Sequence, residues 1–385
     1  MKRKYFALFY TSSNGLEPHL RFKCFKDKWL VANLEKIFKI SAGGDIERKN
    51  FSKEWSQEFS YPVYANALTN SGLYGFANYY KVEGNSITVT GRGDVGHAIA
   101  RYNKYVPIVR LLTLIPKSKT NVLFFENAIN STKIFVESTG VPQLTSPQLG
   151  VVKIHYPHIE EQNKIADFLS LVDKRIEKQR QLVENLKKYK RGYLKNIISE
   201  INTTKYLIKN IVSEHVEKTT KNEQYPILSS TLSGIKLQEN YFNKQAASEN
   251  TIGYKIVPKG YFTYRSMSDT GIFRFNCQNL IEKGIVSPAY PVFILNNAHN
   301  SVYFEYILNE TDYVKQQLLT VKEGGTRYAL SFSKFQSLSI ELPELCIQNK
   351  IAHQINFLNL AIEKEELILT KILLLKQGLL QQMFI

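Results

Sequence analysis

The segment GRGDVG at residues 91–96 has the GxGxxG spacing of a dinucleotide-binding loop. That chemistry needs a helix that begins at the loop, whose dipole attracts the pyrophosphate, and an acidic residue about 20 positions later. The following segment, HAIARYNKYVP, stops at a proline, and residues 108–118 contain no carboxylate. The sequence therefore favours a tight turn that directs Arg92, Asp94 and Arg101 outward, either as plain turn structure or as a binding loop.

A second polar loop, YRSMSDTGIFRF, contains Arg265, Ser266, Asp269 and Arg274. Arginine pairs bidentately with guanine, carboxylates accept from cytosine, and a serine hydroxyl bonds base edges or phosphates. These residue types suit the reading of bases. Each of them suits a solvated surface equally well.

No catalytic motif is recognisable in the sequence. It has no GxSxG segment, no Walker loop, and no Asn or Asp followed by Pro-Pro and an aromatic residue, which would mark an amino-methyltransferase. Cys24, Cys277 and Cys346 form no CxxC pair, and the seven histidines show no ligand spacing. We therefore expect a chain without catalytic residues, metal site or bound cofactor.

The elements that must position these loops form an internal repeat. Residues 157–199 return as residues 343–385 at a constant offset of 186 (343 − 157). QNKIA at residues 162–166 answers QNKIA at residues 348–352, and IEK at 176–178 answers IEK in the second copy. Prolines tolerated at a helix start and glutamates in the first turn of the first copy predict a long helix for each segment.

Apolar residues in both segments follow a heptad spacing, which predicts a seam between two helices. The predicted seam residues are Val172, Ile176, Gln179, Val183, Leu186, Lys190, Leu358, Ile362, Glu365, Leu369, Ile372 and Lys376. The other copy is the simplest partner, although each helix could instead pack only on its neighbouring domain. If the copies pair antiparallel, Lys190 faces Glu365 and Gln179 faces Lys376, because this register satisfies both polar interruptions.

Around the helices, the chain reads as two copies of one α+β domain. Short strand-like runs such as YPVYA, ITVT and VRLLTLI occupy the first copy, and YPILSS, GIFRFN and PAYPVFIL occupy the second. Helical spacing at Leu30, Leu34, Ile37 and Phe38 predicts a helix there. The predicted fold class is thus α+β, with two tandem-duplicated domains separated by two long antiparallel, coiled-coil helices. The predicted parts are residues 1–156, 157–200, 201–342 and 343–385.

The charge balance indicates a polyanionic partner. The 385 residues include 50 Lys and Arg against 34 Asp and Glu, a formal charge of +16. Nucleic acid is the leading candidate. No apolar run approaches the roughly 20 residues needed to span a membrane, and the opening residues do not fit a secretory signal. We therefore expect a cytoplasmic protein without a membrane partner.

These features resemble the specificity subunit of type I restriction-modification enzymes. The resemblance lies in PHLRFKCFKDKW, SGLYG, ITVTGRGDVG, PHIEEQNKIADFLSLVDKRIEKQ and GIVSPAYPVF, and the central helix is its most specific part. The second helix departs from it where Cys346 and Ile347 replace the usual acidic pair, and the residues before Pro18 have no clear counterpart.

The resemblance implies a non-catalytic, DNA-binding subunit. Each domain would read one half of an asymmetric, bipartite target in double-stranded DNA, and the paired helices would set the gap. Two methyltransferase subunits would dock on the helices, restriction subunits would join through them, and S-adenosylmethionine, ATP and magnesium would belong to these partners. The residues assigned to DNA contact are Asn66, Ser71, Tyr74, Arg92, Asp94, Arg101, Lys117, Lys119, Thr231, Arg265, Ser266, Asp269, Arg274, Lys322 and Arg327.

Two other function classes are distinguishable from this one. A helical scaffold that binds no nucleic acid would explain the heptads but not the charge of +16, and a failure to bind DNA at any salt concentration would favour it. A nucleotide-dependent enzyme depends on GRGDVG alone, and calorimetry without nucleotide binding would remove it.

Overall fold

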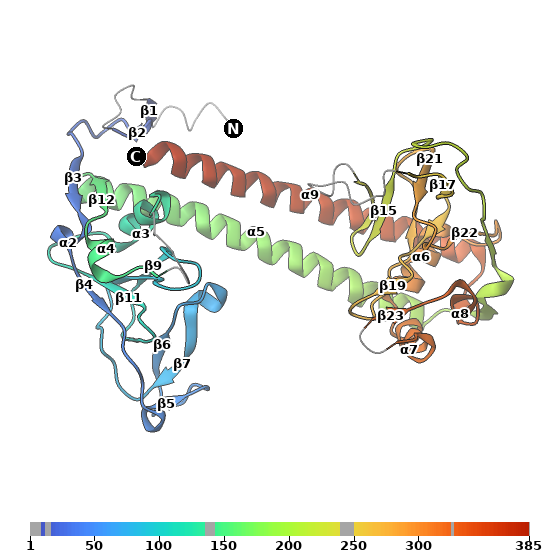
Figure 1. Ribbon diagram of the computed structural model, residues 1–385, viewed down its shortest axis with the longest axis horizontal. Helices are drawn as coiled ribbons and strands as arrows, with labels where there is room; N and C mark the ends of the chain where they lie inside the picture. The colour runs from blue at the N-terminus through green and yellow to red at the C-terminus, as the bar shows by residue number, and fades with distance from the viewer. Residues whose placement is uncertain (1–8, 12–16, 135–142, 239–249, 325–326, 385) are drawn as a thin grey trace. The chain divides into compact units, whose positions relative to one another are not determined.

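The computed structural model describes residues 9–11, 17–134, 143–238, 250–324 and 327–384 (Figure 1). The chain divides into two compact units, one formed by residues 1–181 with 366–385 and the other by residues 182–365. Two long helices, α5 (Ile159–Ser199) and α9 (Leu345–Met383), each begin in one unit and end in the other. The predicted first domain begins, and the distal segment ends, at residues outside the described ones.

The first unit is built on two small sheets. One is antiparallel, in the order β4 (Phe38–Ala42), β11 (Leu112–Pro116), β8 (Ser86–Val89) and β9 (Ala98–Arg101). The other has the order β10 (Val106–Pro107), β6 (Tyr61–Tyr64), β7 (Leu73–Ala77) and β5 (Phe51–Ser52).

Two strand pairs and several short helices complete the first unit. The pairs are β1 (Phe9–Thr11) with β2 (Leu20–Phe22) and β3 (Leu30–Asn33) with β12 (Lys153–Tyr156). The helices are α2 (Leu34–Ile37), α3 (Val122–Ser131), α4 (Ser146–Gly150), η1 (Arg48–Asn50) and η2 (Thr69–Gly72).

The second unit repeats the main sheet, in the order β14 (Val212–Glu214), β22 (Val292–Leu295), β18 (Phe262–Thr263) and β20 (Asn276–Cys277). Its strand pairs are β13 (Thr204–Leu207) with β24 (Ser339–Leu342), β15 (Leu228–Thr231) with β16 (Gly234–Leu237), β17 (Lys255–Pro258) with β21 (Lys283–Val286), and β19 (Met267–Ser268) with β23 (Tyr328–Ala329). Its helices are α6 (Ser301–Glu310), α7 (Asp312–Val321), α8 (Phe332–Gln336) and η3 (Ile208–Asn210).

The two main sheets share one topology. In both, the first strand in sequence lies at an edge, the last lies beside it, and the second and third follow. A helix follows the last of these strands in each unit, α3 after β11 and α6 after β22. The predicted duplication of an α+β domain is therefore confirmed.

Each core includes residues from both long helices. In the first unit Ile165 and Leu169 of α5 pack with Met383 of α9 into the cluster that contains Phe124 and Phe125 of α3. In the second unit Leu194 of α5 and Ile351, Ala352 and Ile355 of α9 join the cluster around Phe262 and Phe304. The start of one helix thus lies with the end of the other in each unit, which is the predicted antiparallel arrangement.

The helix predicted over Leu30, Leu34, Ile37 and Phe38 is wrong. Only α2 is helical there, and β3 and β4 flank it directly. Strand β3 pairs with β12 and β4 pairs with β11, so ladder hydrogen bonds outweigh a helical apolar spacing in this segment.

The predicted register of the helix pair is also wrong. Every predicted seam residue is buried or half-buried, but the Lys190 ammonium donates to Asn359 Oδ1 at 2.6 Å, nearly two turns before Glu365. The equivalent Lys376 donates to Asp173 Oδ1 at 2.6 Å. Both acceptors lie one position beside the seam. The long lysine side chains therefore extend out of the seam to reach these polar partners.

Candidate nucleic-acid interface

The retained Gln-Asn pair of each long helix holds a neighbouring helix cap. In the first unit Gln162 accepts from the backbone N–H of Asn121 at 3.1 Å and donates to the Pro157 carbonyl at 2.9 Å. Asn163 Oδ1 accepts from the Asn121 side chain at 2.8 Å, while Asn121 Oδ1 caps α3 by accepting from Phe124 N–H. The cap of α3 is thereby fixed to α5.

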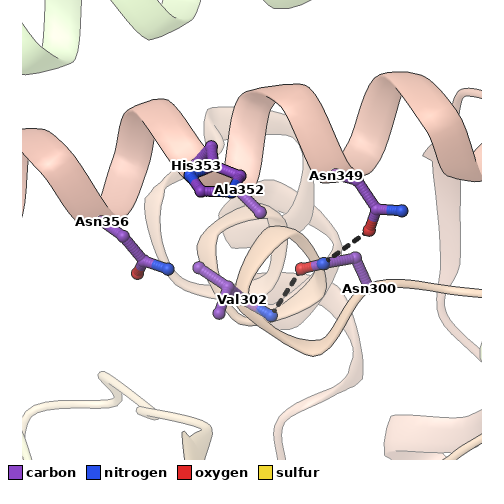
Figure 2. Close-up of a pocket in the computed structure, with 6 residues that line it drawn as sticks. All are labelled: Asn300, Val302, Asn349, Ala352, His353 and Asn356. Carbon is purple, nitrogen blue, oxygen red and sulfur yellow. Dashed lines mark hydrogen bonds between the residues drawn. The ribbon is translucent and has the colours of Figure 1, made fainter.

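The second unit repeats this arrangement, with the Gln-Asn pair at the offset of 186 residues and the capping asparagine at an offset of 179 (300 − 121) (Figure 2). Gln348 accepts from the backbone N–H of Asn300 at 2.9 Å, and Asn349 Oδ1 accepts from the Asn300 side chain at 2.8 Å. Asn300 in turn caps α6 through Val302 N–H at 3.0 Å. Asn300, Val302 and Asn349 line a pocket together with Ala352, His353 and Asn356 (Figure 2).

The same helices also hold the strand that follows the polar loop of each unit. Asn130 of α3 pairs with both backbone groups of Ala98, and Asn309 of α6 pairs with both groups of Phe275. Glu126 accepts from Ala100 N–H at 2.8 Å. The loops before β9 and β20 are therefore tied to a rigid helix in both units.

Burial raises the pKa of two equivalent carboxyls on these helices. The pKa of Glu126 is raised by desolvation, which outweighs its hydrogen bond from Ala100 N–H. Desolvation raises the pKa of Glu305 from 4.5 to about 7, against the opposing effects of Arg274 and Cys277 N–H. Both carboxyls lie beside the main sheets and serve the fold.

Glu161 has a role that the sequence did not indicate. We read it as a first-turn acid that complements the helix dipole, but it is 2% exposed and accepts two hydrogen bonds from Arg21 of β2, at 2.7 and 2.8 Å. Arg21 is itself 1% exposed. Ile347 occupies the equivalent position of α9 and packs against the second core, so the loss of the acidic pair there removes an ion pair rather than a cap.

The predicted contact residues of the first unit meet at two adjoining loops. Asn66 accepts from Gly91 N–H at 2.7 Å and donates to the Val109 carbonyl at 2.5 Å. Arg101 is 7% exposed, donates to the Ser71 carbonyl at 2.7 Å and lies 3.6 Å above the Tyr64 ring. Asn66 and Arg101 therefore hold the loops together, and burial lowers the pKa of Arg101.

The outer side of these loops is basic and strained. Arg92 and Asp94 are exposed, and Arg92 forms a backbone bridge with Gln143, whose side chain accepts from Arg110 at 3.4 Å. Val109 and Arg110 have φ values of 52° and 58°, which cost free energy in residues other than glycine and are typical of functional sites. Arg110 was not predicted as a contact residue, because no local sequence pattern marks it.

The GRGDVG segment is the turn of the antiparallel β8–β9 hairpin. No helix begins at it, so its backbone lacks the dipole that a pyrophosphate site requires. The structure supports the turn and not the nucleotide fingerprint.

The remaining predicted residues of the first unit lie on its surface. Tyr74 is 47% exposed, stacks on Phe51 at 5.3 Å, and lies 3.6 Å below the Lys53 ammonium, a cation that we did not predict. Lys117 is exposed and donates to the Glu35 carbonyl at 2.6 Å, and Lys119 is exposed beside it.

Four predicted residues of the second unit gather on the β19–β23 ribbon. Ser266 precedes β19 and donates to the Ala289 carbonyl at 2.7 Å. Arg327 pairs with Asp269 at 3.1 Å across the ribbon, and both side chains are at least half exposed. The Lys322 ammonium lies 3.9 Å from the centre of the Tyr328 ring. The ribbon thus presents cations, a carboxylate and hydroxyls together.

The other three are dispersed. Arg265 is exposed next to the ribbon, and Thr231 closes the β15–β16 turn by donating to the Gly234 carbonyl at 2.8 Å. Arg274 pairs with Glu310 of α6 at 2.7 Å. Burial lowers the pKa of Lys190, and the nearby Arg274 guanidinium adds to this effect.

Comparison with known proteins agrees with this duplicated architecture. The chain is similar to the crystal structure of a type I restriction-modification system S subunit from M. genitalium, with a TM-score of 0.60 at 16% identity over 96% of this chain and 99% of that one. A chain from a study of complex assembly and conformational transition of the type I R-M system has a TM-score of 0.53 at 12% identity, covering 91% and 96%. At these identities the similarity concerns the fold.

Two curated relatives from Mycoplasma pneumoniae (strain ATCC 29342 / M129 / Subtype 1) are similar in sequence. The type I specificity subunit S.MpnORF507P is 32% identical over 128 residues, 33% of this chain and 35% of that protein. S.MpnORF285P is 32% identical over 143 residues, 36% of this chain and 46% of that protein. The chain thus spans less than half the length of these two relatives.

Among the described residues, no helix combines the length and apolar character needed to cross a membrane. The family described as type I restriction modification DNA specificity domain matches residues 26–188 and again residues 194–372. The chain therefore belongs to the type I restriction-modification DNA specificity family and contains two copies of its domain.

Proposed function

We propose that this chain is the DNA-recognition subunit of a type I restriction-modification complex. Each unit binds one half of a bipartite, asymmetric target in double-stranded DNA. The first unit uses the loops around Arg92 and Arg110, and the second uses the β19–β23 ribbon with Arg265 and Arg327. The chain itself catalyses no step.

The observation that supports this proposal is that both units of a basic chain have the same main sheet and the same helix behind their polar loops. The main sheets of the two units have the same strand order, and in both units a helix capped by a long helix holds the strand that follows the polar loop. A fixed scaffold with exposed arginines can read base edges, whereas the net charge of +16 favours the phosphate backbone.

The partners follow from family membership and from the helices. We infer that α5 and α9 bind two methyltransferase subunits and that restriction subunits join the complex through them. S-adenosylmethionine, ATP and magnesium are then held by those subunits. This chain acts where the DNA is, in the cytoplasm.

The test is single-molecule sequencing of methylated bases in host DNA, with and without this gene. We expect a bipartite methylated motif that disappears with the gene. A second host strain should carry a hybrid gene in which residues 18–200 come from a homologue. The hybrid should methylate a target with one altered half, and a hybrid that methylates the original full target would contradict the proposal.

A further inference from the structure

The two long helices retain a few residues across the repeat, and most of these have a role inside their own unit. The Gln-Asn pair clamps a helix cap in each unit, and the seam lysine donates to the facing helix. Gly192 of α5 and Gly378 of α9 are also retained at the offset of 186 residues. Their retention needs a different explanation.

Neither glycine is required by the fold of its own unit. Both lie within a helix, where glycine is a poor residue because it has more conformational freedom to lose than any other. A Cβ added at either position would meet no described atom within 4 Å beyond the helix's own nearby backbone. Neither has the positive φ that favours glycine. Within the described residues, an alanine would therefore fit at both positions and would stabilise the helix.

Exposed apolar side chains accompany both glycines. Tyr189 lies three residues before Gly192 and is 56% exposed, and Leu375 lies three residues before Gly378 and is 58% exposed. Leu182 is exposed on the same side of α5 as Tyr189. In each unit, one long helix thus has a large, exposed apolar side chain next to a glycine whose backbone no side chain covers.

We propose that Gly192 and Gly378 are equivalent contact points at which a helix of a partner subunit packs directly against the backbone of α5 and of α9. A missing side chain lets two backbones approach closely, and the neighbouring tyrosine or leucine fits between ridges of the incoming helix. Because the point occurs once in each unit, the partner binds in two copies. The inference rests on the proposed function, which makes that partner the methyltransferase subunit.

The charges around the glycines indicate the chemistry of the partner helix. Lys188, Arg191 and Lys195 are exposed around Gly192. The equivalent positions around Gly378 are Leu374, Gln377 and Gln381. A partner helix with an apolar stripe and flanking carboxylates fits both, and its contact with α5 weakens more with added salt than its contact with α9.

The test uses the full chain with the purified methyltransferase subunit of the same system. Gly192→Leu and Gly378→Leu place a bulky side chain at each contact point, and Gly192→Ala and Gly378→Ala add a single methyl group. Gln316→Leu adds a leucine at an exposed position of α7, outside the two long helices, and is the matched control. Light scattering after size exclusion gives the number of methyltransferase subunits per chain, titration gives their affinity, and circular dichroism gives the melting temperature.

We expect two methyltransferase subunits per wild-type chain, one for each single leucine variant and none for the double variant. Each glycine-to-leucine change should weaken its own site at least about tenfold, as overpacking does, while Gln316→Leu retains two subunits. The alanine variants should melt at or above the wild-type temperature. Two subunits bound with wild-type affinity by the double leucine variant, or a lower melting temperature for the alanine variants, would overturn the inference. A wild-type chain that binds no methyltransferase subunit would instead refute the proposed function.

Discussion

The Lys376 ammonium lies 2.6 Å from Asp173 Oδ1, and this contact explains how the helix pair accommodates a cation in its seam. The equivalent contact in the second unit joins Lys190 to Asn359, also at 2.6 Å. The two contacts differ in one atom of the acceptor group, because the carboxylate of the first is an amide in the second. The repeat therefore provides an internal comparison of a charged and a neutral partner.

Asn359→Asp is expected to stabilise the second unit by about 1 kcal/mol, because a hydrogen bond between two charged groups is stronger than one to a neutral acceptor. Burial lowers the pKa of Lys190, so a carboxylate beside it favours the charged form of the lysine. Thermal melting of the purified chain measures the change. Asp173→Asn is the matched reverse change and should lower the melting temperature, and a loss of stability in Asn359→Asp would contradict the argument.

The buried pair of Arg21 and Glu161 should be the most sensitive ion pair of the first unit. Glu161→Gln removes the carboxylate that accepts two hydrogen bonds from the buried Arg21 guanidinium and leaves Glu17, 3.9 Å away, as a more distant counter-charge. We expect a loss of about 3 kcal/mol in the free energy of unfolding. Urea titration followed by tryptophan fluorescence measures it, because Trp29 lies in the same core.

The pair of Lys259 and Glu282 provides the control for this prediction. It is exposed, with its side chains 53% and 85% accessible, and Lys259→Ala should change stability by no more than about 1 kcal/mol. Replacing both Arg21 and Glu161 with leucine should cost less than Glu161→Gln alone, because no buried charge then remains. Equal losses for both variants would show that the pair acts through packing and not through charge.

Glu305 should make the second unit less stable as the pH rises. Its pKa is 4.5 in the unfolded chain and about 7 in the folded one, so the folded state binds more protons between these values. The contribution of this carboxyl to stability is greatest below about pH 4.5, falls through the interval, and is lost above about pH 7, for a total of up to about 3 kcal/mol. Melting temperatures from pH 5 to 8 for wild type and Glu305→Gln give the contribution of this carboxyl as their difference. Parallel pH profiles for the two proteins would contradict the assignment.

Much of the fold was predictable because the repeat imposes the same local signals twice. The strand-like runs ITVT and PAYPVFIL became β8 and β22, and the two long helices form as their heptads indicate. The helix predicted around Leu34 and Ile37 was wrong, because the apolar residues of this segment reach one core from two strands and a single helical turn. Sequence spacing does not distinguish that arrangement from a helix when strand pairing is unknown.

The candidate site was less predictable than the fold. Residue type selected Arg101 and Arg274 as base readers, yet one is 7% exposed and the other pairs with Glu310. The pairing of distant segments decides which arginines face outward, as for Arg110, whose partner Gln143 is far from it in sequence. The predicted helix register was wrong for a related reason. The acceptors Asp173 and Asn359 lie beside the seam, and the heptad pattern considers only residues within the seam.

Arginines that face outward should alter one half of the DNA target each. Arg92→Ala and Arg110→Ala should relax the methylated motif only in the half read by the first unit, and Arg265→Ala and Arg327→Ala only in the other. A lost bidentate contact to guanine costs about 1–3 kcal/mol of discrimination at one base pair. Sequencing of methylated bases in hosts that carry each variant measures the effect.

Lys119→Ala is the control for sequence-independent binding, because an exposed lysine near a phosphate weakens all sequences alike. Its motif should stay intact while the affinity for DNA and the slope of its logarithm against the logarithm of salt concentration both fall. Arg274→Ala is the control for an arginine held inside the fold by Glu310. It should lower the melting temperature and leave both halves of the motif unchanged, because its guanidinium is paired with Glu310 of α6. A single substitution among the outward arginines that alters both halves would contradict the assignment of one half to each unit.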